Sequence, residues 1–362
     1  MNVKQLGFTE FFENQYDYLK QNNKYKNCIP ARITLEHKHS YRVRSGAFEW
    51  LATLSGHFIY TTVSRTDFPA VGDWVLVEKL QGEDKAIIHH VFERKSKFSR
   101  KMAGTIIDEQ IVAANVDIVF IAMSLNEDFN IRRLERYLIA AWDSGAKPVV
   151  VLTKADLCDD VESFERRVNN IAFGVEVFPV YALIGKGLVQ IQNLLAEGVS
   201  GALLGSSGVG KSTLVNALLE TEKMKISSIR EDDAKGRHTT THRELVLLPN
   251  GGILIDTPGM RELQLWEQND SFDTSFQDIE EFAERCKFRN CTHTNEPGCF
   301  VQQKIQAREL ETKRLQSYFK LKKELDFIEK KTMKQTKLEE KRKEKKAAKK
   351  NKKKYKNNYS NE

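Results

Sequence analysis

Apolar positions near the start of the chain recur first at helical spacing and then at the spacing of short strands. From residue 30 to about 98, short alternating runs are interrupted by turn pairs such as Ser45-Gly46 and Gln81-Gly82. Five or so strands in about 65 residues predict a small barrel of the OB type, although an SH3-like barrel has similar spacing. The helical positions are Phe8, Phe11, Phe12, Tyr16 and Leu19, and the predicted strands include Ala31–Leu35, Glu49–Thr53, Asp73–Glu78 and Ala86–Phe92.

After about residue 110 the pattern changes to strands that alternate with amphipathic helices. This alternation predicts a doubly wound α/β sheet, in which ligand-binding loops follow the carboxyl ends of the strands. A hairpin around Pro249–Gly252, a cysteine-rich segment and a helix over Gln306–Lys330 are expected to follow. The predicted strands are Val116–Met123, Pro148–Leu152, Val175–Val180, Ala202–Leu204, Leu245–Leu248 and Ile253–Asp256, and the predicted helices are Ile131–Ser144, Asp160–Phe173 and Leu188–Glu197.

The basic residues gather at the C-terminal end. Residues 330–362 hold 15 Lys and Arg against 4 Glu, a net charge of +11, while the whole chain carries +7. The residues before this tail therefore carry −4. A like-charged, aromatic-poor block is typical of a disordered arm that binds nucleic acid, and a solvated tail that favours solubility is the alternative.

Composition also bears on the cellular compartment. The chain has no run of 18 apolar residues, so we expect no transmembrane helix and no membrane partner. No secretory core precedes Glu10 and Glu13. The five cysteines are an odd number and three of them cluster, which favours a metal site in the reducing cytoplasm over a disulfide framework. We therefore expect a cytoplasmic protein in which Cys28 and Cys158 are ordinary side chains.

A phosphate-binding loop follows the predicted strand Ala202–Leu204. Its sequence fits the pattern Gly-x4-Gly-Lys-Ser completely, and a helix is predicted to begin near Ser212. Backbone N–H groups of such a loop close around a β-phosphate, Lys211 supplies positive charge to the β- and γ-phosphates, and the Ser212 hydroxyl binds Mg²⁺. The predicted nucleotide-binding residues here are Gly205, Ser206, Ser207, Gly208, Val209, Gly210, Lys211, Ser212 and Thr213.

Two further segments suit a sensor for magnesium and the γ-phosphate. The element Asp256-Thr-Pro-Gly259 ends an apolar strand; Asp256 is expected to hold Mg²⁺ and the Gly259 N–H to contact the γ-phosphate. The polar stretch between this element and the phosphate loop suits a switch segment whose threonine completes the magnesium shell. We assign Thr240 to that role, with Thr239 and Thr241 as alternatives.

A base-recognition loop follows the predicted strand Pro148–Leu152. Asp156 is expected to accept hydrogen bonds from N1 and N2 of guanine, a charge-assisted pair that discriminates against adenine. Thr153 stands where GTPases usually have asparagine, and the loop around Ala182 is similar to the loop whose backbone N–H meets guanine O6. The predicted base-binding residues are Thr153, Lys154, Ala155, Asp156 and Ala182.

These loops occur in an unusual order. In an ordinary GTPase the base loop comes after both the phosphate loop and the γ-phosphate element, but here Thr153–Asp156 precedes the phosphate loop by about 50 residues. Domain termini are often close together, so helix Leu188–Glu197 can join directly to strand Ala202–Leu204 while the chain begins elsewhere. The order therefore predicts a circularly permuted GTPase whose γ-phosphate element leads into the cysteine-rich segment.

Four side chains that can bind a metal lie in a stretch of 14 residues inside that segment: Cys286, Cys291, His293 and Cys299. Three thiolates and one imidazole favour tetrahedral Zn²⁺. Four protein ligands leave no open position, so we expect one structural zinc ion per chain, which organises a segment that has little core of its own.

The barrel-like start, the permuted loops and the segment from Cys286 to Cys299 resemble the RsgA/YjeQ family of bacterial GTPases over roughly residues 30–325. The resemblance implies hydrolysis of GTP to GDP, stimulated by the small (30S) ribosomal subunit during its late maturation, with 16S rRNA as a partner and a monomeric protein. The predicted domains are a helical extension (1–29), an OB-fold RNA-binding domain (30–105), a circularly permuted GTPase domain (106–265), a mostly helical zinc-binding domain (266–329) and a Lys-rich disordered tail (330–362).

The motifs do not identify the group that orients the attacking water. Met260 occupies the position where Ras-type enzymes place glutamine, and methionine cannot orient water. We take His238, in the switch segment, as the catalytic candidate beside Lys211, while Arg237 or Arg261 could stabilise charge. The alternatives are contact between His238 and ribosomal RNA and a solvated loop histidine with no catalytic role.

Two other functions would use some of the same residues. An ATPase or kinase would share the phosphate loop, and Asp156 and the Ala182 loop argue against it. A non-catalytic RNA-binding scaffold with a vestigial nucleotide site is the second, and the intact Lys211, Ser212 and Asp256 argue against that. Hydrolysis of GTP and ATP, with and without small subunits, distinguishes all three.

Overall fold

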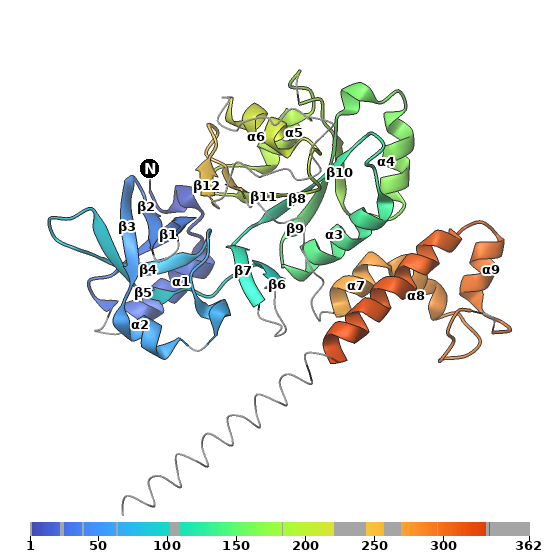
Figure 1. Ribbon diagram of the computed structural model, residues 1–362, viewed down its shortest axis with the longest axis horizontal. Helices are drawn as coiled ribbons and strands as arrows, with labels where there is room; N and C mark the ends of the chain where they lie inside the picture. Colours follow the sequence, from blue (N-terminus) through green and yellow to red (C-terminus); the bar gives the residue numbers. More distant parts are fainter. Residues whose placement is uncertain are drawn as a thin grey trace, which may run out of the picture. The chain divides into compact units, whose positions relative to one another are not determined.

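The computed structural model describes residues 2–21, 25–37, 40–62, 64–101, 109–182, 184–220, 244–256, 269–294, 296–330 and 333, with the backbone alone at 100, 101, 256, 269 and 270. These residues form two compact units. One contains a small barrel and an α/β sheet, and the other is the C-terminal helical unit (Figure 1). Among the described helices we find none with the length and apolar content needed to cross a membrane.

The first half of the larger unit is a closed five-stranded barrel. Its strands follow the order β1-β2-β3-β5-β4, and β4 returns to pair with β1, with Ile29 opposite Val77. A short helix fills the connection between β3 and β4, and Ser55 caps it by accepting a hydrogen bond from the Phe58 N–H. This arrangement confirms the predicted OB-type barrel. The elements are β1 (Ile29–Glu36), β2 (Tyr41–Ser45), β3 (Phe48–Leu54), α2 (Gly56–Thr61), β4 (Trp74–Lys79) and β5 (Lys85–Val91).

A helical segment before the barrel packs against it through aromatic rings. Helix α1 (Glu10–Lys20) carries Phe12, and Phe8 precedes the helix. The Phe8 ring centroid lies 4.7 Å from that of Trp74 and 5.9 Å from that of Phe92, in edge-to-face arrangements. All four rings are buried, so this segment closes one side of the barrel core.

One buried arginine joins the N-terminal segment, the barrel and the start of the sheet. The Arg32 guanidinium donates to the carbonyl oxygens of Leu6 at 2.6 Å, Asn115 at 3.0 Å and Gly72 at 3.1 Å. Burial lowers the pKa of Arg32 to about 10, against the opposing effect of the Asp117 and Asp73 carboxylates. Because three carbonyls from three segments share this side chain, the barrel is anchored where the α/β sheet begins.

The second half of the larger unit is a doubly wound sheet. Strands β10, β9, β8, β11 and β13 run parallel in that order, and β12 pairs antiparallel with β13, which confirms the predicted hairpin. Helices α3 and α4 pack on one face and α5 and α6 on the other (Figure 1). The strands are β8 (Ile118–Ser124), β9 (Lys147–Thr153), β10 (Glu176–Pro179), β11 (Ser200–Leu204), β12 (Glu244–Leu247) and β13 (Ile253–Asp256), and the helices are α3 (Ile131–Asp143), α4 (Val161–Asn169), α5 (Leu188–Leu194) and α6 (Lys211–Leu219).

Two connections link the barrel and the sheet. Strand β12 pairs with β1 of the barrel, with Leu35 opposite Glu244, so one hydrogen-bonded sheet of 11 strands runs through both. A separate hairpin, formed by β6 (Lys97–Lys101) and β7 (Glu109–Ala114), lies between them in the sequence. The sequence pattern did not predict this hairpin.

The C-terminal unit is built from helices around a small aromatic core. The rings of Phe272, Phe276 and Tyr318 lie 4.9 to 5.5 Å apart by their centroids. The single helix predicted over Gln306–Lys330 is wrong at its start, because Arg308 adopts a left-handed backbone (φ 59°) and ends the preceding helix. The helices are α7 (Asn269–Ser275), α8 (Gln277–Ala283), α9 (Phe300–Gln306) and one over residues 312–330.

Candidate functional site

The predicted phosphate loop lies between β11 and α6, at the carboxyl edge of the sheet. A side chain could not replace hydrogen at Gly205, because a Cβ there would lie 2.7 Å from the Ala122 carbonyl oxygen. The Lys211 amino group lies over the loop and donates to the carbonyl oxygens of Gly205 at 2.7 Å and Ser206 at 2.5 Å. Ser212 and Thr213 follow in the first turn of α6 and are half-buried. The loop therefore has the strand–loop–helix form that binds phosphates.

The predicted base loop begins where β9 ends, on the same edge. Thr153 is buried, and its hydroxyl donates to the Val209 carbonyl oxygen at 2.5 Å, with the Met123 carbonyl oxygen at 3.3 Å. Lys154 has a left-handed backbone (φ 55°) and is half-buried, whereas Asp156 is exposed in the short 3₁₀ turn that follows. The structure thus brings the base loop against the phosphate loop and directs Thr153 toward that loop.

A third predicted loop follows β10 at this edge. Tyr181 and Lys186 face each other across it: the Tyr181 N–H donates to the Lys186 carbonyl at 3.0 Å, and the Lys186 amino group lies 4.7 Å from the centroid of the Tyr181 ring. A Cβ at Gly187 would lie 2.4 Å from the Pro179 carbonyl oxygen, so the tight return into α5 requires glycine. Ala182 is half-buried in this turn, and its N–H role stays a prediction.

The magnesium and γ-phosphate element is described only in part. Strand β13 runs parallel to β11 and ends at Asp256, so the backbone of Asp256 reaches the same edge as the phosphate loop. Several other predicted residues lie outside the described residues, and their roles stay predictions. These are Arg237, His238, Thr239, Thr240, Thr241, Gly259, Met260 and Arg261, together with the tail beyond Lys330 except residue 333.

Asp128 is a residue near the site that the sequence reading missed. It follows β8, and its carboxylate accepts a 2.6 Å hydrogen bond from the Ser206 hydroxyl of the phosphate loop. Burial raises the pKa of Asp128, but hydrogen bonds from Arg133 and Ser206 and the charges of Arg133 and Lys154 outweigh it and hold the pKa below its ordinary value. The polar run after a fully buried strand was the signal, because it marks another loop at the ligand edge.

The four predicted zinc ligands come together in the C-terminal unit. Their ligand atoms all lie within 4.8 Å of one another. The Cys286 and Cys299 sulfurs are 3.9 Å apart, and each is 3.6 Å from Nδ1 of His293. Tetrahedral zinc with ordinary bond lengths would separate two sulfurs by about 3.8 Å and a sulfur from a nitrogen by about 3.6 Å. The donor set and its spacing therefore fit a zinc ion.

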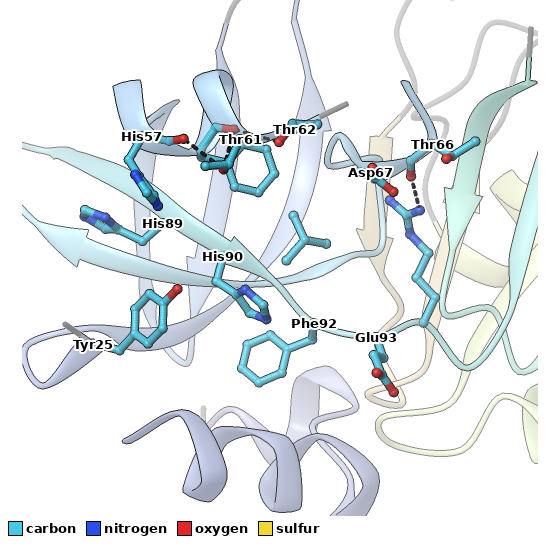
Figure 2. A pocket seen from close by; sticks show the side chains of 13 residues that line it. Tyr25, His57, Thr61, Thr62, Thr66, Asp67, His89, His90, Phe92 and Glu93 are labelled. Atoms are coloured by element: carbon cyan, nitrogen blue, oxygen red, sulfur yellow. Dashed lines mark hydrogen bonds between the residues drawn. The ribbon is translucent and has the colours of Figure 1, made fainter. Parts of the chain in front are cut away.

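The barrel also carries a cavity of about 480 Å³. Figure 2 shows histidines toward one end of it and the carboxylates of Asp67 and Glu93 toward the other. Nε2 of His89 lies 3.0 Å from a carboxylate oxygen of Glu78. In the described part of the chain, the cysteine-rich segment alone gathers three or more metal-type ligands, so this cavity has no such cluster.

The loops that follow β9, β10 and β11 share one edge of a parallel sheet with the end of β13, and the base loop comes first in the chain. This defines a circularly permuted P-loop GTPase, preceded by an OB-type barrel and followed by a Cys/His unit. A family model described as RsgA GTPase matches residues 91–266, and one described as 50S ribosome-binding GTPase matches residues 200–350. The chain belongs to the RsgA GTPase family and is a GTP hydrolase.

Individual relatives support this assignment. Small ribosomal subunit biogenesis GTPase RsgA 1 of Oceanobacillus iheyensis is 46% identical over 323 residues, covering 88% of this chain and 92% of the relative. The crystal structure of YjeQ from Thermotoga maritima matches with a TM-score of 0.60 and 24% identity, covering 82% of this chain and 98% of that one. YloQ, described as a circularly permuted GTPase, matches with a TM-score of 0.58 and 21% identity, covering 84% and 97%. The two structures establish the fold.

Proposed function

We propose that this GTPase acts in late maturation of the small (30S) ribosomal subunit and that the subunit stimulates its hydrolysis of GTP to GDP and phosphate. The observation that carries the proposal is 46% identity, over 88% of this chain, with a relative named for biogenesis of that subunit. The permuted order supports a switch, because it places the predicted γ-phosphate element directly before the C-terminal unit in the chain, where a change at the nucleotide can be coupled to that unit.

The nucleotide roles follow the chemistry of each loop. The N–H groups of residues 205–212 and the Lys211 ammonium bind the phosphates, and Asp156, Lys154 and the Ala182 N–H bind guanine. Ser212, Thr240 and Asp256 would hold Mg²⁺, and the ion would supply positive charge beside the phosphates. His238 orients the attacking water.

Zinc would have a structural role in the C-terminal unit. Cys286, Cys291, His293 and Cys299 supply four ligands and leave no position for substrate. Backbone N–H groups of Phe300 and Gln302 point at the Cys286 and Cys299 sulfurs, at 3.3 and 3.5 Å, and these bonds favour the thiolate form that binds the metal.

The barrel and the Lys-rich tail would contact 16S rRNA. The +11 net charge of residues 330–362 favours phosphate binding, and OB-type barrels bind oligonucleotides. We further propose that the protein acts as a monomer in the cytoplasm, where ribosomal subunits mature.

The test is hydrolysis of GTP and of ATP by the full chain, alone and with purified small subunits. We expect slow GTP turnover alone, a large increase with small subunits and no ATP turnover. Purified large subunits are the matched control, because one matching family model is described as 50S-binding. Lys211→Ala should abolish turnover in every condition. Stimulation by large but not small subunits, or equal use of ATP, would refute the proposal.

A further inference from the structure

Side chains from two neighbouring segments anchor the phosphate loop at two points. Thr153 binds the Val209 carbonyl at 2.5 Å, and Asp128 binds the Ser206 hydroxyl at 2.6 Å. Between these anchors lie Ser207 and Gly208, both of them exposed. The two contacts therefore bracket the exposed part of the loop, where phosphate oxygens would approach the backbone.

Contacts other than the Ser206 bond fix the position of Asp128. The Arg133 guanidinium donates to both carboxylate oxygens of Asp128, at 2.8 and 3.2 Å, and to its carbonyl oxygen at 2.7 Å. The Asp128 N–H donates to the Asn126 side chain at 3.1 Å, and Ser124 donates to the same Asn126 oxygen at 2.8 Å. Arg133 thus fixes the Asp128 carboxylate and Asn126 fixes its backbone, so Asp128 loses little further freedom when it accepts the Ser206 bond.

The segment that contains Asp128 also contacts the helix that follows the base loop, through the ring of Phe129. Phe129 packs edge-to-face on Phe164, with centroids 4.7 Å apart, and the Arg167 guanidinium lies 5.0 Å from the Phe129 centroid. Phe164 and Arg167 belong to α4, the helix that follows the base loop. The segment with Asp128 thus touches the phosphate loop and the element behind the base loop.

Lys211 makes the Ser206 anchor more important once nucleotide binds. Its ammonium now donates to the Gly205 and Ser206 carbonyl oxygens. In its proposed role it also donates to the β- and γ-phosphates, so its three N–H donors are shared between the phosphates and these carbonyl oxygens. The Asp128 bond does not involve the lysine and can persist through that change.

We propose that Asp128 is a positioning residue of the nucleotide site: through Ser206 it holds the first half of the phosphate loop in its binding shape and sets how long a guanine nucleotide stays bound. This rests on the proposed nucleotide role of residues 205–212. Asp128 does not contact the reacting atoms, so its loss weakens binding more than it slows the chemical step.

The experiment measures displacement of a fluorescent GDP analogue from the full chain by excess GDP. A lost hydrogen bond to a carboxylate corresponds to about a tenfold change, so Asp128→Ala and Ser206→Ala should each speed dissociation about tenfold. The double variant should match either single variant, because both remove one contact. The KM for GTP should rise about tenfold in Asp128→Ala while kcat changes less than threefold. Glu127→Ala, an exposed neighbouring carboxylate, should stay within twofold of wild type.

Three outcomes would overturn the proposal: dissociation from Asp128→Ala within twofold of wild type, additive effects in the double variant, or a fall in kcat that exceeds the rise in KM. If Asp128→Ala fails to fold by thermal unfolding, Ser206→Ala in the half-buried loop tests the same contact and decides the proposal. A wild-type protein that binds no GDP would instead refute the nucleotide role itself.

Discussion

The Thr153 hydroxyl donates a hydrogen bond to the Val209 carbonyl oxygen, 2.5 Å away and 56 residues later in the sequence. The last residue of β9 therefore supports the phosphate loop at the carboxyl edge of the sheet. Thr153 and Val209 are both buried, at 2% and 1% exposure, so water does not compete for this bond. Thr153, which stands where GTPases usually have asparagine, thus has a defined hydrogen-bond partner in the phosphate loop.

Thr153→Val tests this contact with almost no change of shape. Valine leaves the buried Val209 carbonyl without this donor, at a cost of about 1–3 kcal/mol, and we expect GDP to bind about tenfold more weakly. Thr153→Ser keeps the hydroxyl and is the matched control. Titration of a fluorescent GDP analogue measures both, and equal affinity for Thr153→Val and wild type would contradict the anchoring role.

The loop order and the apolar strands were readable from the sequence because each depends on local pattern. The phosphate loop follows a short apolar run, and a buried parallel strand needs no polar face. The Thr153–Val209 bond was not readable, since it depends on which strands become neighbours. The same holds for the bond between Asp128 and Ser206, which are 78 residues apart, although the polar run after β8 did mark a loop at the ligand edge.

Two errors of the sequence reading have local causes. The hairpin of β6 and β7 was missed: the short apolar run Ile111–Ala114 stands directly before the predicted strand Val116–Met123, and Asn115, with a left-handed backbone (φ 55°), separates β7 from β8. In the C-terminal unit, helical spacing continues across Arg308, although its left-handed backbone separates two helices. Single backbone reversals at residues other than glycine leave little trace in a hydrophobic pattern.

Asp156→Asn tests whether the base loop reads guanine. An amide cannot accept hydrogen bonds from both N1 and N2 of guanine as a carboxylate does, so we expect GTP affinity to fall about 100-fold and XTP affinity to rise. Asp159→Asn changes a second exposed aspartate just after the same loop and should have no effect. Competition of GTP, XTP and ATP against a fluorescent nucleotide gives the order of preference. An unchanged preference for GTP would exclude Asp156 as the reader of the base.

Cys299→Ser tests the metal role in the C-terminal unit. Serine removes one thiolate ligand of the four, so we expect less than one zinc ion per chain and easier proteolysis of residues 269–330. Cys158→Ser, outside the cluster, should keep its zinc. GDP binding should persist in both variants, because the ligands belong to a separate compact unit. A full zinc content in Cys299→Ser, measured by a colorimetric chelator, would argue against this ligand set.

His238→Ala tests the candidate for orienting the attacking water. Met260 cannot fill that role, since its thioether donates no hydrogen bond, and an imidazole in the switch segment can. We expect the variant to lose turnover stimulated by small subunits by at least about 100-fold, within the range typical of general-base groups, and to bind GDP as wild type does. Loss of RNA contact is the alternative cause, and His242→Ala, a second histidine just after the switch segment, is the matched control. Co-sedimentation with small subunits separates the two effects: a His238→Ala protein that no longer sediments with the subunit has lost RNA contact, and equal stimulated rates in variant and wild type would remove His238 from the mechanism.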